Sequence, residues 1–400
     1  LLRGPIAVDF VVNESMVASG YPIRFWEQIH GGLSKHVWDF GDGTRVANSP
    51  SVEHAWASPG TFEVVLTAYN ADWPGGVSAT QEVSILSIEE SAIHVSPDGN
   101  DSNDGTSWAS AKKTIQAGVD AQNFLGGGVL VGSGSYSLTN EIVVDKQVRI
   151  IGVDGPDSTK VDGQGQVRCF NLGDSACVVE GLTITNGYSS GSGGGIYCSG
   201  ASILTNCTIT GNSAFQYGGG MYYGTVNNCT ITGNSAGSGG GMRGGTANNC
   251  TITGNSAAQN GGGMLYGTVN NCILSGNSAG MGGGISGVVA NNCTISGNSA
   301  GYSGGGVNYG TLNNCTIIGN TAEVGGGTYD GTANNCTISD NTATEEGGGM
   351  RGGAANNCTI SGNSAEYGGG MRGGTANNCT ISGNSAEYGG GMSFCTADNC

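Results

Sequence analysis

The chain has 400 residues, of which 78 are glycine and only 11% are charged, and its formal net charge at pH 7 is −17. This acidic balance disfavours nucleic acid and anionic membrane surfaces as partners, because both repel a negatively charged protein. No apolar stretch approaches the ~20 residues that are needed to span a bilayer, so we expect no direct membrane insertion by this segment.

Residues 1–90 alternate apolar and polar side chains, as strands do, for example in FEVVLTAY at 62–69. Trp38 and Phe40 are expected in the core. The segments HVWDFGDGT (36–44) and VEHAWASPGTF (52–62) resemble the WDFGDGT and HxYxxPGxYxV motifs of PKD domains, with Trp56 and Phe62 where tyrosine is commoner. This resemblance implies a seven-stranded immunoglobulin-like sandwich at about residues 6–88, usually a spacer or adhesive module of extracellular proteins.

Residues 91–180 are expected to form the N-terminal cap and the first coils of a β-helix. Ile115 and Val119 are one helical turn apart and predict a short helix within residues 111–121. The segment resembles the opening of pectate-lyase-like right-handed β-helices, in which a strand, an acidic loop and a helix precede a Gly-Gly-x-Val-x-Val strand, here beginning at Gly127. Such a helix would cover the unpaired edge of the first coil.

The acidic run from Asp98 to Asp104 is the one candidate cofactor site that we identify. Its carboxylates and loop carbonyls suit calcium, but the spacing of an EF-hand is absent, and a solvated turn is the alternative.

Residues 181–400 form a repeat array with a period of 21 or 22 residues, which indicates a solenoid. Each repeat contains a glycine triplet and a Cys-Thr-Ile-Ser-Gly-Asn motif, in which apolar and hydroxyl side chains alternate as in a half-buried strand. We therefore predict an all-β chain whose array is a right-handed parallel β-helix. The residues after the triplets and the asparagines of Gly-Asn-Ser should form internal columns, the asparagines as a hydrogen-bonded ladder.

The repeats also resemble those of a known family of surface proteins. Gly-Gly-Gly-Met followed by Ile-Ser-Gly-Asn is similar to the paired GGA[ILV] and FxxN motifs of chlamydial polymorphic outer-membrane proteins. This chain has Gly for the family's Ala and Ile for its Phe, and it adds a cysteine. The resemblance implies an extracellular or cell-surface location.

Ten cysteines form a column of their own in the predicted array. Neighbouring coils hold Cβ atoms ~4.8 Å apart, whereas a relaxed disulfide needs roughly 3.5–4.5 Å, so we expect buried free thiols that act as small apolar fillers. A row of sulfurs does not converge on one point, so we predict no metal site. The ten cysteines are Cys207, Cys229, Cys250, Cys272, Cys293, Cys315, Cys336, Cys358, Cys379 and Cys400.

Four further cysteines lie outside the column, at Cys169, Cys177, Cys198 and Cys395, and local bridges among them remain open. Fourteen cysteines in such a chain fit an oxidising or extracellular setting. The first residues lack the apolar core of a signal peptide, and Cys400 interrupts a repeat. We therefore expect the chain to be a piece of a longer protein that is truncated at its C-terminus.

Enzymes that cleave polysaccharides on this fold need acids clustered on one face. From Gly181 onward the chain has three basic residues, eight acidic ones and no histidine, so we predict no catalytic residue there. The alternative is a secreted polysaccharide lyase or glycoside hydrolase. Its active site would lie beyond residue 400 or in the first coils, near Asp145, Asp154, Asp157 and Asp162.

The favoured hypothesis is a non-enzymatic extracellular or cell-surface protein, a rigid β-helical stalk or adhesin that carries a PKD module. Tyr367 and Tyr388 lie one coil apart, as do Arg351 and Arg372, and we predict these four as ligand-binding residues. The tyrosines would offer a stacking surface to sugar rings; the alternative is an ordinary solvent-facing role. The expected partners are a glycan, another cell-surface molecule, or further copies of the chain.

Overall fold

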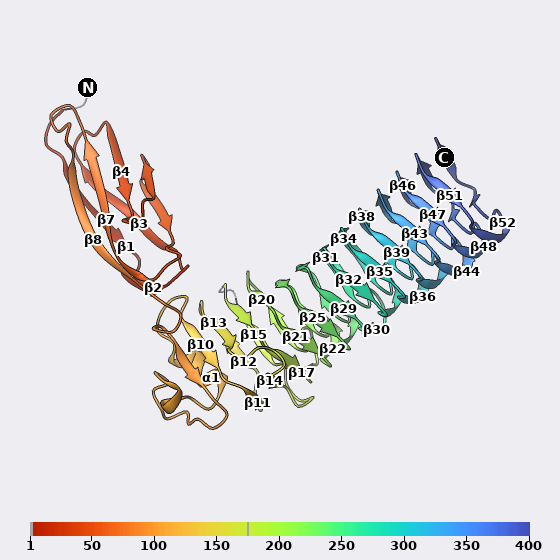
Figure 1. Cartoon of the computed structure of the whole chain (residues 1–400), viewed down its shortest axis with the longest axis horizontal. Helices are drawn as coiled ribbons and strands as arrows, with labels where there is room; N and C mark the ends of the chain where they lie inside the picture. Colours follow the sequence, from red (N-terminus) through yellow and green to blue (C-terminus); the bar gives the residue numbers. More distant parts are fainter. Residues whose placement is uncertain (1–2, 174–175) are drawn as a thin grey trace. The chain divides into compact units, whose positions relative to one another are not determined.

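The computed structural model describes residues 3–173 and 176–400 and confirms an almost entirely β chain (Figure 1). The chain divides into two compact units. The first comprises the residues up to Lys113 together with Ala117–Leu130 and Gln147–Arg149. The second comprises Thr114–Gln116, Val131–Lys146 and Ile150–Cys400.

A β-sandwich forms the N-terminal part of the first unit. One sheet has the strand order β1-β3-β6 and the other β2-β8-β7-β4-β5. Because the short β2 pairs with β8 in parallel, the sandwich has eight strands, one more than the resemblance implied. The strands are β1 (Ala7–Val12), β2 (Met16–Ala18), β3 (Ile23–His30), β4 (Lys35–Asp39), β5 (Arg45–Ala47), β6 (Ser51–His54), β7 (Gly60–Tyr69) and β8 (Val77–Leu86).

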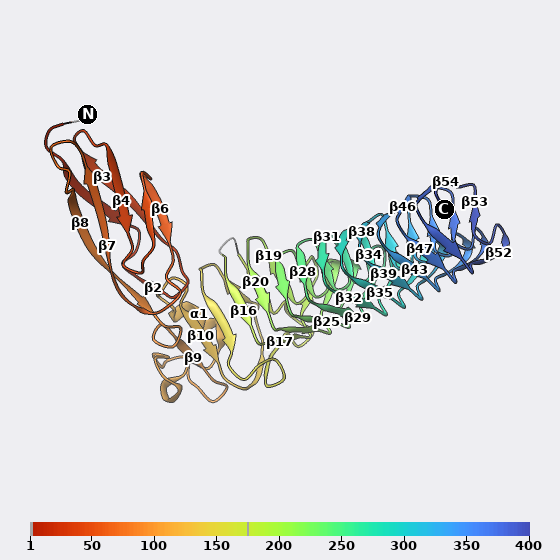
Figure 2. The same cartoon turned by 45° about the horizontal axis from the view of Figure 1, so that its top comes forward.

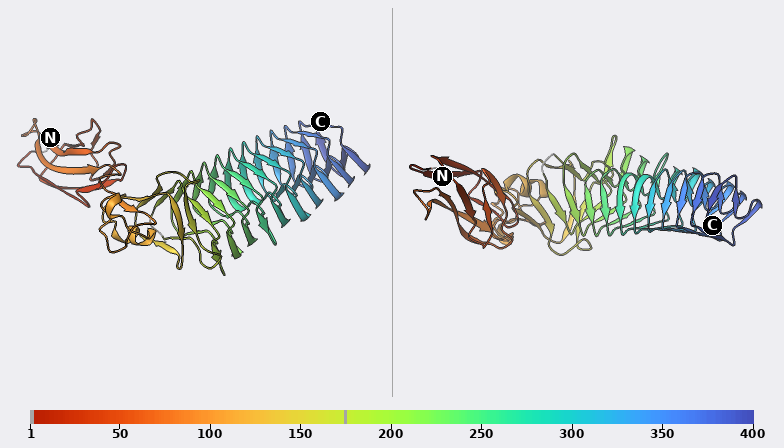
Figure 3. Two further views of the ribbon diagram at one scale, coloured as in Figure 1. Left: turned by 60° about the horizontal axis from the view of Figure 1, so that its bottom comes forward. Right: turned by 90° about the horizontal axis from the view of Figure 1, so that it is seen from above.

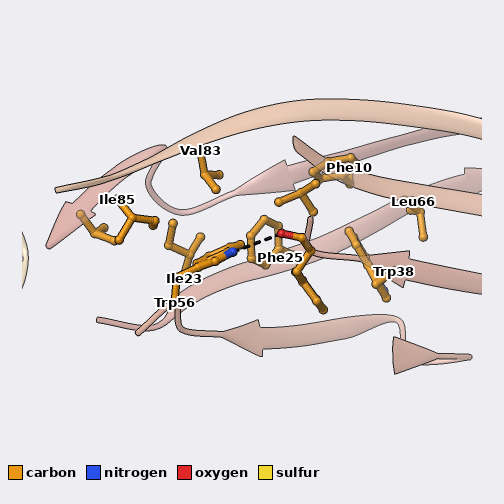
Figure 4. Packing of buried hydrophobic residues seen from close by; sticks show 11 residues of the cluster. Phe10, Ile23, Phe25, Trp38, Trp56, Leu66, Val83 and Ile85 are labelled. Atoms are coloured by element: carbon orange, nitrogen blue, oxygen red, sulfur yellow. Dashed lines mark hydrogen bonds between the residues drawn. The ribbon is translucent and has the colours of Figure 1, made fainter. Parts of the chain in front are cut away.

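Aromatic side chains fill the interior of the sandwich (Figure 4). Trp38 and Phe40 are fully buried, as their alternation predicted. Trp56 is buried beside them and donates its indole N–H to the carbonyl of Phe40, at 3.1 Å. The tryptophan that replaces tyrosine in the second motif therefore joins the core and satisfies its one polar atom.

The cap region contains β9 (Ile93–Val95), the 3-10 turn η1 (Trp108–Ser110), the helix α1 (Ile115–Ala121) and β10 (Gly128–Val131). Ile115 and Val119 are buried, which confirms the predicted apolar edge of the helix. A Cβ atom at Gly118 would meet the side chains of Val95 and Val129, so glycine allows α1 to pack closely on both strands.

The second unit is a parallel β-solenoid, and Figures 2 and 3 show its strands stacked coil on coil in chain order. One sheet takes a strand from each coil at the Cys-Thr-Ile motif. It contains β11 (Gly134–Ser137), β14 (Thr159–Asp162), β17 (Thr183–Thr185), β21 (Thr208–Thr210), β25 (Thr230–Thr232), β29 (Thr251–Thr253), β32 (Ile273–Ser275), β35 (Thr294–Ser296), β39 (Thr316–Ile318), β43 (Thr337–Ser339), β47 (Thr359–Ser361) and β51 (Thr380–Ser382).

A second sheet is formed just before the glycine triplets. It contains β18 (Tyr188–Ser189), β22 (Ser213–Tyr217), β26 (Ser235–Ser238), β30 (Ser256–Ala257), β33 (Ser278–Met281), β36 (Ser299–Ser303), β40 (Thr321–Val324), β44 (Thr342–Glu346), β48 (Ser364–Tyr367) and β52 (Ser385–Tyr388).

The third sheet follows the triplets and takes two short strands from most coils, which merge into one in β31 and β34. It contains β12 (Ile142–Val144), β13 (Arg149–Gly152), β15 (Phe170–Leu172), β16 (Val178–Glu180), β19 (Ile196–Cys198), β20 (Ile203–Thr205), β23 (Met221–Tyr222), β24 (Thr225–Asn227), β27 (Met242–Arg243), β28 (Thr246–Asn248), β31 (Met264–Asn270), β34 (Ile285–Asn291), β37 (Val307–Asn308), β38 (Thr311–Asn313), β41 (Thr328–Tyr329), β42 (Thr332–Asn334), β45 (Met350–Arg351), β46 (Ala354–Asn356), β49 (Met371–Arg372), β50 (Thr375–Asn377), β53 (Met392–Ser393) and β54 (Thr396–Asp398).

Like residues stack in register inside the solenoid, as predicted. Ile231 pairs with Ile252 in the next coil, and Met221 with Met242, and all four side chains are fully buried. The threonines beside the isoleucines remain half-buried or exposed. Each coil therefore buries its apolar face against its neighbours.

The predicted asparagine ladder is present and buried. Asn277 donates its backbone N–H and its side-chain N–H to Oδ1 of Asn298, both at 3.0 Å, and Asn298 does the same to Asn320. A second ladder, which we did not predict, runs along the surface. There Asn291 donates its side-chain N–H to Oδ1 of Asn270 in the preceding coil, at 2.8 Å.

The second asparagine of each Asn-Asn-Cys motif has a separate role. Asn271 and Asn292 have φ of 53° and 54°, the left-handed conformation that asparagine tolerates better than most residues. The glycine triplet is constrained by its backbone conformation and by the close approach of the next coil. Gly261 has φ of 64°, and a Cβ on Gly262 or Gly263 would strike the backbone of the next coil. These positions explain why the repeat keeps Asn-Asn and Gly-Gly-Gly.

All fourteen cysteines are free thiols, and those of the column from Cys207 to Cys379 are buried. This confirms the expected buried free thiols, and the thiols also contact backbone groups, which we did not predict. The backbone N–H of Cys293 donates to Sγ of Cys315 at 3.4 Å, and Sγ of Cys293 lies 3.2 Å from the carbonyl of Asn291, to which it donates. Each of these sulfurs thus accepts a backbone N–H of the preceding coil that a methyl group would leave unpaired.

Candidate binding face beside the glycine triplets

Aromatic and cationic side chains of the repeats gather beside the glycine triplets. Ten of the twelve aromatic residues after residue 190, and all three arginines, occupy three positions: immediately before a triplet, second after it, or third after it. We call these positions the triplet face. Its aromatic and arginine members are Tyr197, Tyr217, Tyr222, Tyr223, Arg243, Tyr266, Tyr309, Tyr329, Arg351, Tyr367, Arg372, Tyr388 and Phe394.

Arg243 is the centre of the first cluster on this face. Its Cζ lies 5.1, 5.2, 5.2 and 5.9 Å from the ring centroids of Tyr217, Tyr222, Tyr223 and Tyr266. Its Nη1 also donates to the hydroxyls of Tyr222 and Tyr223, at 3.1 and 2.8 Å. Arg243 is the only Asp, Glu, Lys, Arg or His residue between Glu180 and Glu323. The one formal charge of this stretch therefore holds four tyrosines together through cation–π contacts.

A ring stack extends this cluster toward the first coils. Tyr197 and Tyr222 are nearly parallel, with centroids 5.1 Å apart and an interplanar angle of 7°. The Cζ of Arg168 lies 5.1 Å from the centroid of Tyr197, and its Nη1 forms an ion pair with Glu141 at 2.6 Å.

The four ligand-binding residues predicted from the sequence lie in a second cluster. Tyr367 and Tyr388 stack with centroids 5.0 Å apart and an interplanar angle of 11°. The Cζ of Arg372 lies 6.0 Å from the centroid of Tyr367, and its Nη2 lies 3.6 Å from a carboxylate oxygen of Glu346. Arg351 donates to the same carboxylate at 3.0 Å, and this hydrogen bond raises the pKa of Arg351.

Sequence reasoning missed two members of the second cluster. Glu346 bridges the two arginines, and Phe394 has its ring centroid 4.3 Å from Cζ of Arg372. Both were detectable in principle, because Glu346 precedes a triplet as Tyr367 does, and Phe394 is third after one.

The third position after the triplet carries an unusual backbone conformation. Tyr223, Tyr266, Tyr309 and Phe394 have φ of 57°, 57°, 52° and 54°. Bulky side chains in this left-handed region cost on the order of 1–3 kcal/mol each, and glycine occupies the same position in several other coils. This pattern was not predicted from the sequence.

A polar hollow of about 560 Å³ lies at the first coils and is lined by Asp162, Gln164, Gly165, Asn186, Gly187, Tyr188, Gly211 and Ser213. Asp162 receives hydrogen bonds from the side chain of Asn186, at 3.0 Å, and the backbone of Gln164, at 2.9 Å, and lies 2.8 Å from Nζ of Lys160. Burial acts to raise its pKa, but the contacts with Lys160, Asn186 and Gln164 outweigh burial and hold the pKa below its ordinary value.

The other three acids proposed for an enzymatic alternative, Asp145, Asp154 and Asp157, are not among the described residues that line this hollow. Asp154 instead accepts a hydrogen bond from Ser133.

The acidic loop proposed for calcium uses its carboxylates internally. Asp101 accepts a hydrogen bond from the backbone of Lys113 at 2.8 Å, and Asp104 accepts one from Ser110 Oγ at 2.7 Å. The bonds from Ser110 and Thr106 lower the pKa of Asp104 to about 2. Over residues 3–173 and 176–400, no group of three or more His, Cys, Asp or Glu side chains is placed to hold a metal ion. Calcium binding by this loop stays a prediction.

Comparison with known proteins gave matches to two families and to several solved structures. Residues 7–84 match the PKD domain family, and residues 167–298 match the family described as periplasmic copper-binding protein (NosD). No curated protein matches the chain.

Three solved structures resemble this chain at low sequence identity and low TM-score. The A-module of Azotobacter vinelandii mannuronan C-5 epimerase AlgE6 is 12% identical, with 71% of this chain and 94% of that chain covered and a TM-score of 0.38. A mannuronic acid specific polysaccharide family 6 lyase from human gut microbiota is 13% identical, with 67% and 77% covered and a TM-score of 0.35. A structure of carbohydrate-binding modules from the β-sandwich superfamily is 21% identical, with 21% of this chain covered and a TM-score of 0.20; the match spans only 35% of that chain.

No helix among the described residues combines the length and apolar character that crossing a membrane requires.

The two family matches suggest a surface or periplasmic protein. The chain carries a PKD domain at residues 7–84, and its solenoid matches the β-helical NosD family over residues 167–298.

Proposed function

We propose that the chain is a non-enzymatic extracellular or cell-surface protein, a rigid β-helical stalk that carries a PKD module and binds a partner through the triplet face. The observation that carries this proposal is that buried and exposed positions of each coil differ in how much they vary from coil to coil. The buried columns and ladders repeat with little change, whereas the exposed aromatic and charged residues vary at three positions beside the triplet. Positions that vary on a fixed scaffold are suited to recognition.

The expected partner is a glycan or another cell-surface molecule. The stacked pair Tyr367 and Tyr388 offers an apolar surface with polar edges, and Tyr388 is 53% exposed. Arg351 and Arg372 lie in the same cluster and bring hydrogen-bond donors, although Glu346 engages both. Self-association into longer assemblies through this face is the alternative mode of binding.

Adhesion assays on the whole chain test the proposal. Tyr367→Ser together with Tyr388→Ser should leave the fold intact and reduce binding to glycan arrays or to cells. Tyr302→Ser is the matched control, because Tyr302 is 67% exposed and lies outside the triplet face. Equal loss of binding in the control, or unchanged binding in the double variant, would contradict a role for these tyrosines.

A second candidate function is a polysaccharide lyase or hydrolase, and the hollow at Asp162 favours it. An ionised carboxylate beside Lys160, in an open polar depression, has the residue types that acid–base chemistry on sugars needs. The test is incubation with pectin, alginate and related polymers, followed by measurement of unsaturated products and new reducing ends. Activity that Asp162→Asn abolishes would establish the enzyme and overturn the non-enzymatic proposal.

The name of the matched NosD family raises the question of copper. Soft copper ions prefer several thiolates that converge on one point. Here the thiols are arranged one per coil, and each is already engaged with backbone N–H and carbonyl groups, as Cys293 is. The cysteine column does not fit such a site, and the proposed function involves no copper chemistry.

A further inference from the structure

Three tyrosines of the triplet face recur at every second coil. Tyr223, Tyr266 and Tyr309 are each third after a triplet, and the coils between them have Gly244 and Gly287 at that position. The strand register places these five coils in direct succession. With ~4.8 Å between paired strands, successive tyrosines are about 9.6 Å apart along the shaft.

The intervening glycines make room for the rings. A Cβ on Gly244 would lie 2.7 Å from Cε1 of Tyr223, and a Cβ on Gly287 would lie 2.7 Å from Cδ1 of Tyr266. The rings of Tyr223 and Tyr266 therefore extend along the shaft over the glycine of the next coil, whereas Tyr309 is followed by Asp330 at that position. A residue larger than glycine at position 244 or 287 would collide with the ring of the preceding coil.

Much of the row is exposed, although Tyr223 and Tyr266 also contact Arg243 and Tyr309 contacts Tyr329. Tyr223, Tyr266 and Tyr309 are 43%, 54% and 55% exposed, so a large part of each ring faces solvent. All three have a left-handed backbone that glycine, as found in the neighbouring coils, would adopt without strain. Strained, exposed aromatic residues at regular intervals point to a ligand.

Arg243 adds a polar element to the row. Its Nη1 holds the hydroxyls of Tyr222 and Tyr223, whereas its Nε is buried without a hydrogen-bond partner. No acidic residue occurs between Glu180 and Glu323, so this part of an acidic protein does not itself repel a polar or anionic chain.

We propose that Tyr223, Tyr266 and Tyr309 form a binding track for an extended β-1,4-linked glycan that lies parallel to the shaft axis. The C–H groups on one face of a pyranose ring pack on the electron-rich face of an aromatic ring. In an extended β-1,4-linked chain every second sugar presents the same face, and the length of two such sugars is close to the two-coil spacing. The proposal rests on the proposed function, because it names the glycan that the stalk binds.

The experiment compares affinities of the whole chain for cellohexaose and for maltohexaose, an α-linked hexamer that curves, by isothermal titration calorimetry. The test variant combines Tyr223→Gly, Tyr266→Gly and Tyr309→Gly, which suits the left-handed backbone and keeps the protein folded. The control combines Phe215→Gly and Tyr302→Gly, since both residues are highly exposed and lie off the row.

We expect cellohexaose to bind more tightly than maltohexaose, and the triple variant to lose affinity on the order of tenfold or more. Its melting temperature should stay close to that of the unmodified chain, because relief of the left-handed strain offsets the lost contacts with Arg243 and Tyr329. The control should bind as the unmodified chain does. Absence of cellohexaose binding, equal affinity for both hexamers, or full affinity in the triple variant would overturn the track while leaving adhesion through the second cluster intact. Cleavage of cellohexaose by the unmodified chain would instead overturn the non-enzymatic function.

Discussion

Thr328 is a polar residue in an apolar column. It pairs with Val307 and Met350 in the neighbouring coils, it is fully buried, and its Oγ1 has no hydrogen-bond partner. Thr328→Val keeps the shape and removes the unpaired hydroxyl, so we expect the free energy of unfolding to rise by about 1 kcal/mol. Chemical denaturation measures this change. Thr337→Val, at an exposed threonine, is the control and should have little effect.

Asp162 should make the stability of the shaft depend on pH. Because its folded pKa lies below the ordinary value of about 3.9, its contribution is present above that value and is lost as pH falls through the folded pKa. The difference in melting temperature between the unmodified chain and Asp162→Asn should be largest near neutral pH and shrink below about pH 4. Asp157→Asn, at an exposed acid, is the control.

The sequence predicted which residues are neighbours along a column but not which columns face each other. Stacking of Tyr367 on Tyr388 followed from their offset of one coil. The tyrosines around Arg243 come from both sides of a triplet, and only the geometry of that turn brings Tyr217 to Arg243. The left-handed tyrosines could have been inferred, since glycine occupies the aligned position in the coils between them.

The two asparagine ladders differ in burial and should differ in their contribution to stability. In Asn298→Ala, two N–H groups of Asn277 lose their acceptor and the carbonyl of Leu274 loses its donor, all inside the shaft. We expect a loss of about 3 kcal/mol. Asn291→Ala, in the half-buried outer ladder, should cost ~1 kcal/mol or less, because water can replace the bond. Equal losses in urea denaturation would contradict this assignment.

The cysteine column should stay reduced and protected from alkylation until the shaft unfolds. Every thiol from Cys207 to Cys379 is buried, so an alkylating reagent can reach it only after the coils that enclose it open. The exposed Cys400 provides an internal control that should react at once with iodoacetamide. Peptide mass spectrometry without reduction would detect any disulfide between successive coils, which would show the prediction to be wrong.

At the level of elements, the period and the alternation of Cys-Thr-Ile were sufficient to predict a parallel β-helix with buried columns. The outer asparagine ladder was missed because adjacent asparagines also predict a turn. In this repeat the first asparagine of the pair forms the ladder, and the second adopts the left-handed turn conformation. The role of the thiols was underestimated because cysteine was treated as an apolar residue. The backbone N–H of Cys293 needs a hydrogen-bond acceptor, and the sulfur of Cys315 in the next coil provides it.

For the solenoid as a whole, stability is carried by contacts between successive coils, so whole coils should be removable. Deletion of residues 347–367 joins Glu346 to the next triplet and keeps every column in register. We expect an unchanged β spectrum by circular dichroism and a melting temperature within a few degrees of the parent. Deletion of residues 347–356 alone shifts the columns and should abolish cooperative unfolding; if both deletions behave alike, the columns do not determine the fold.

The two asparagine ladders have opposite directions. In the inner ladder the side-chain carbonyl of Asn298 accepts from the preceding coil, whereas in the outer ladder that of Asn270 accepts from the following coil. Each coil therefore contributes two side-chain amide dipoles that oppose each other along the axis. Adding or losing coils therefore leaves the summed dipole of these side-chain amides small. Duplication can therefore lengthen the shaft without adding a net side-chain amide dipole along its axis.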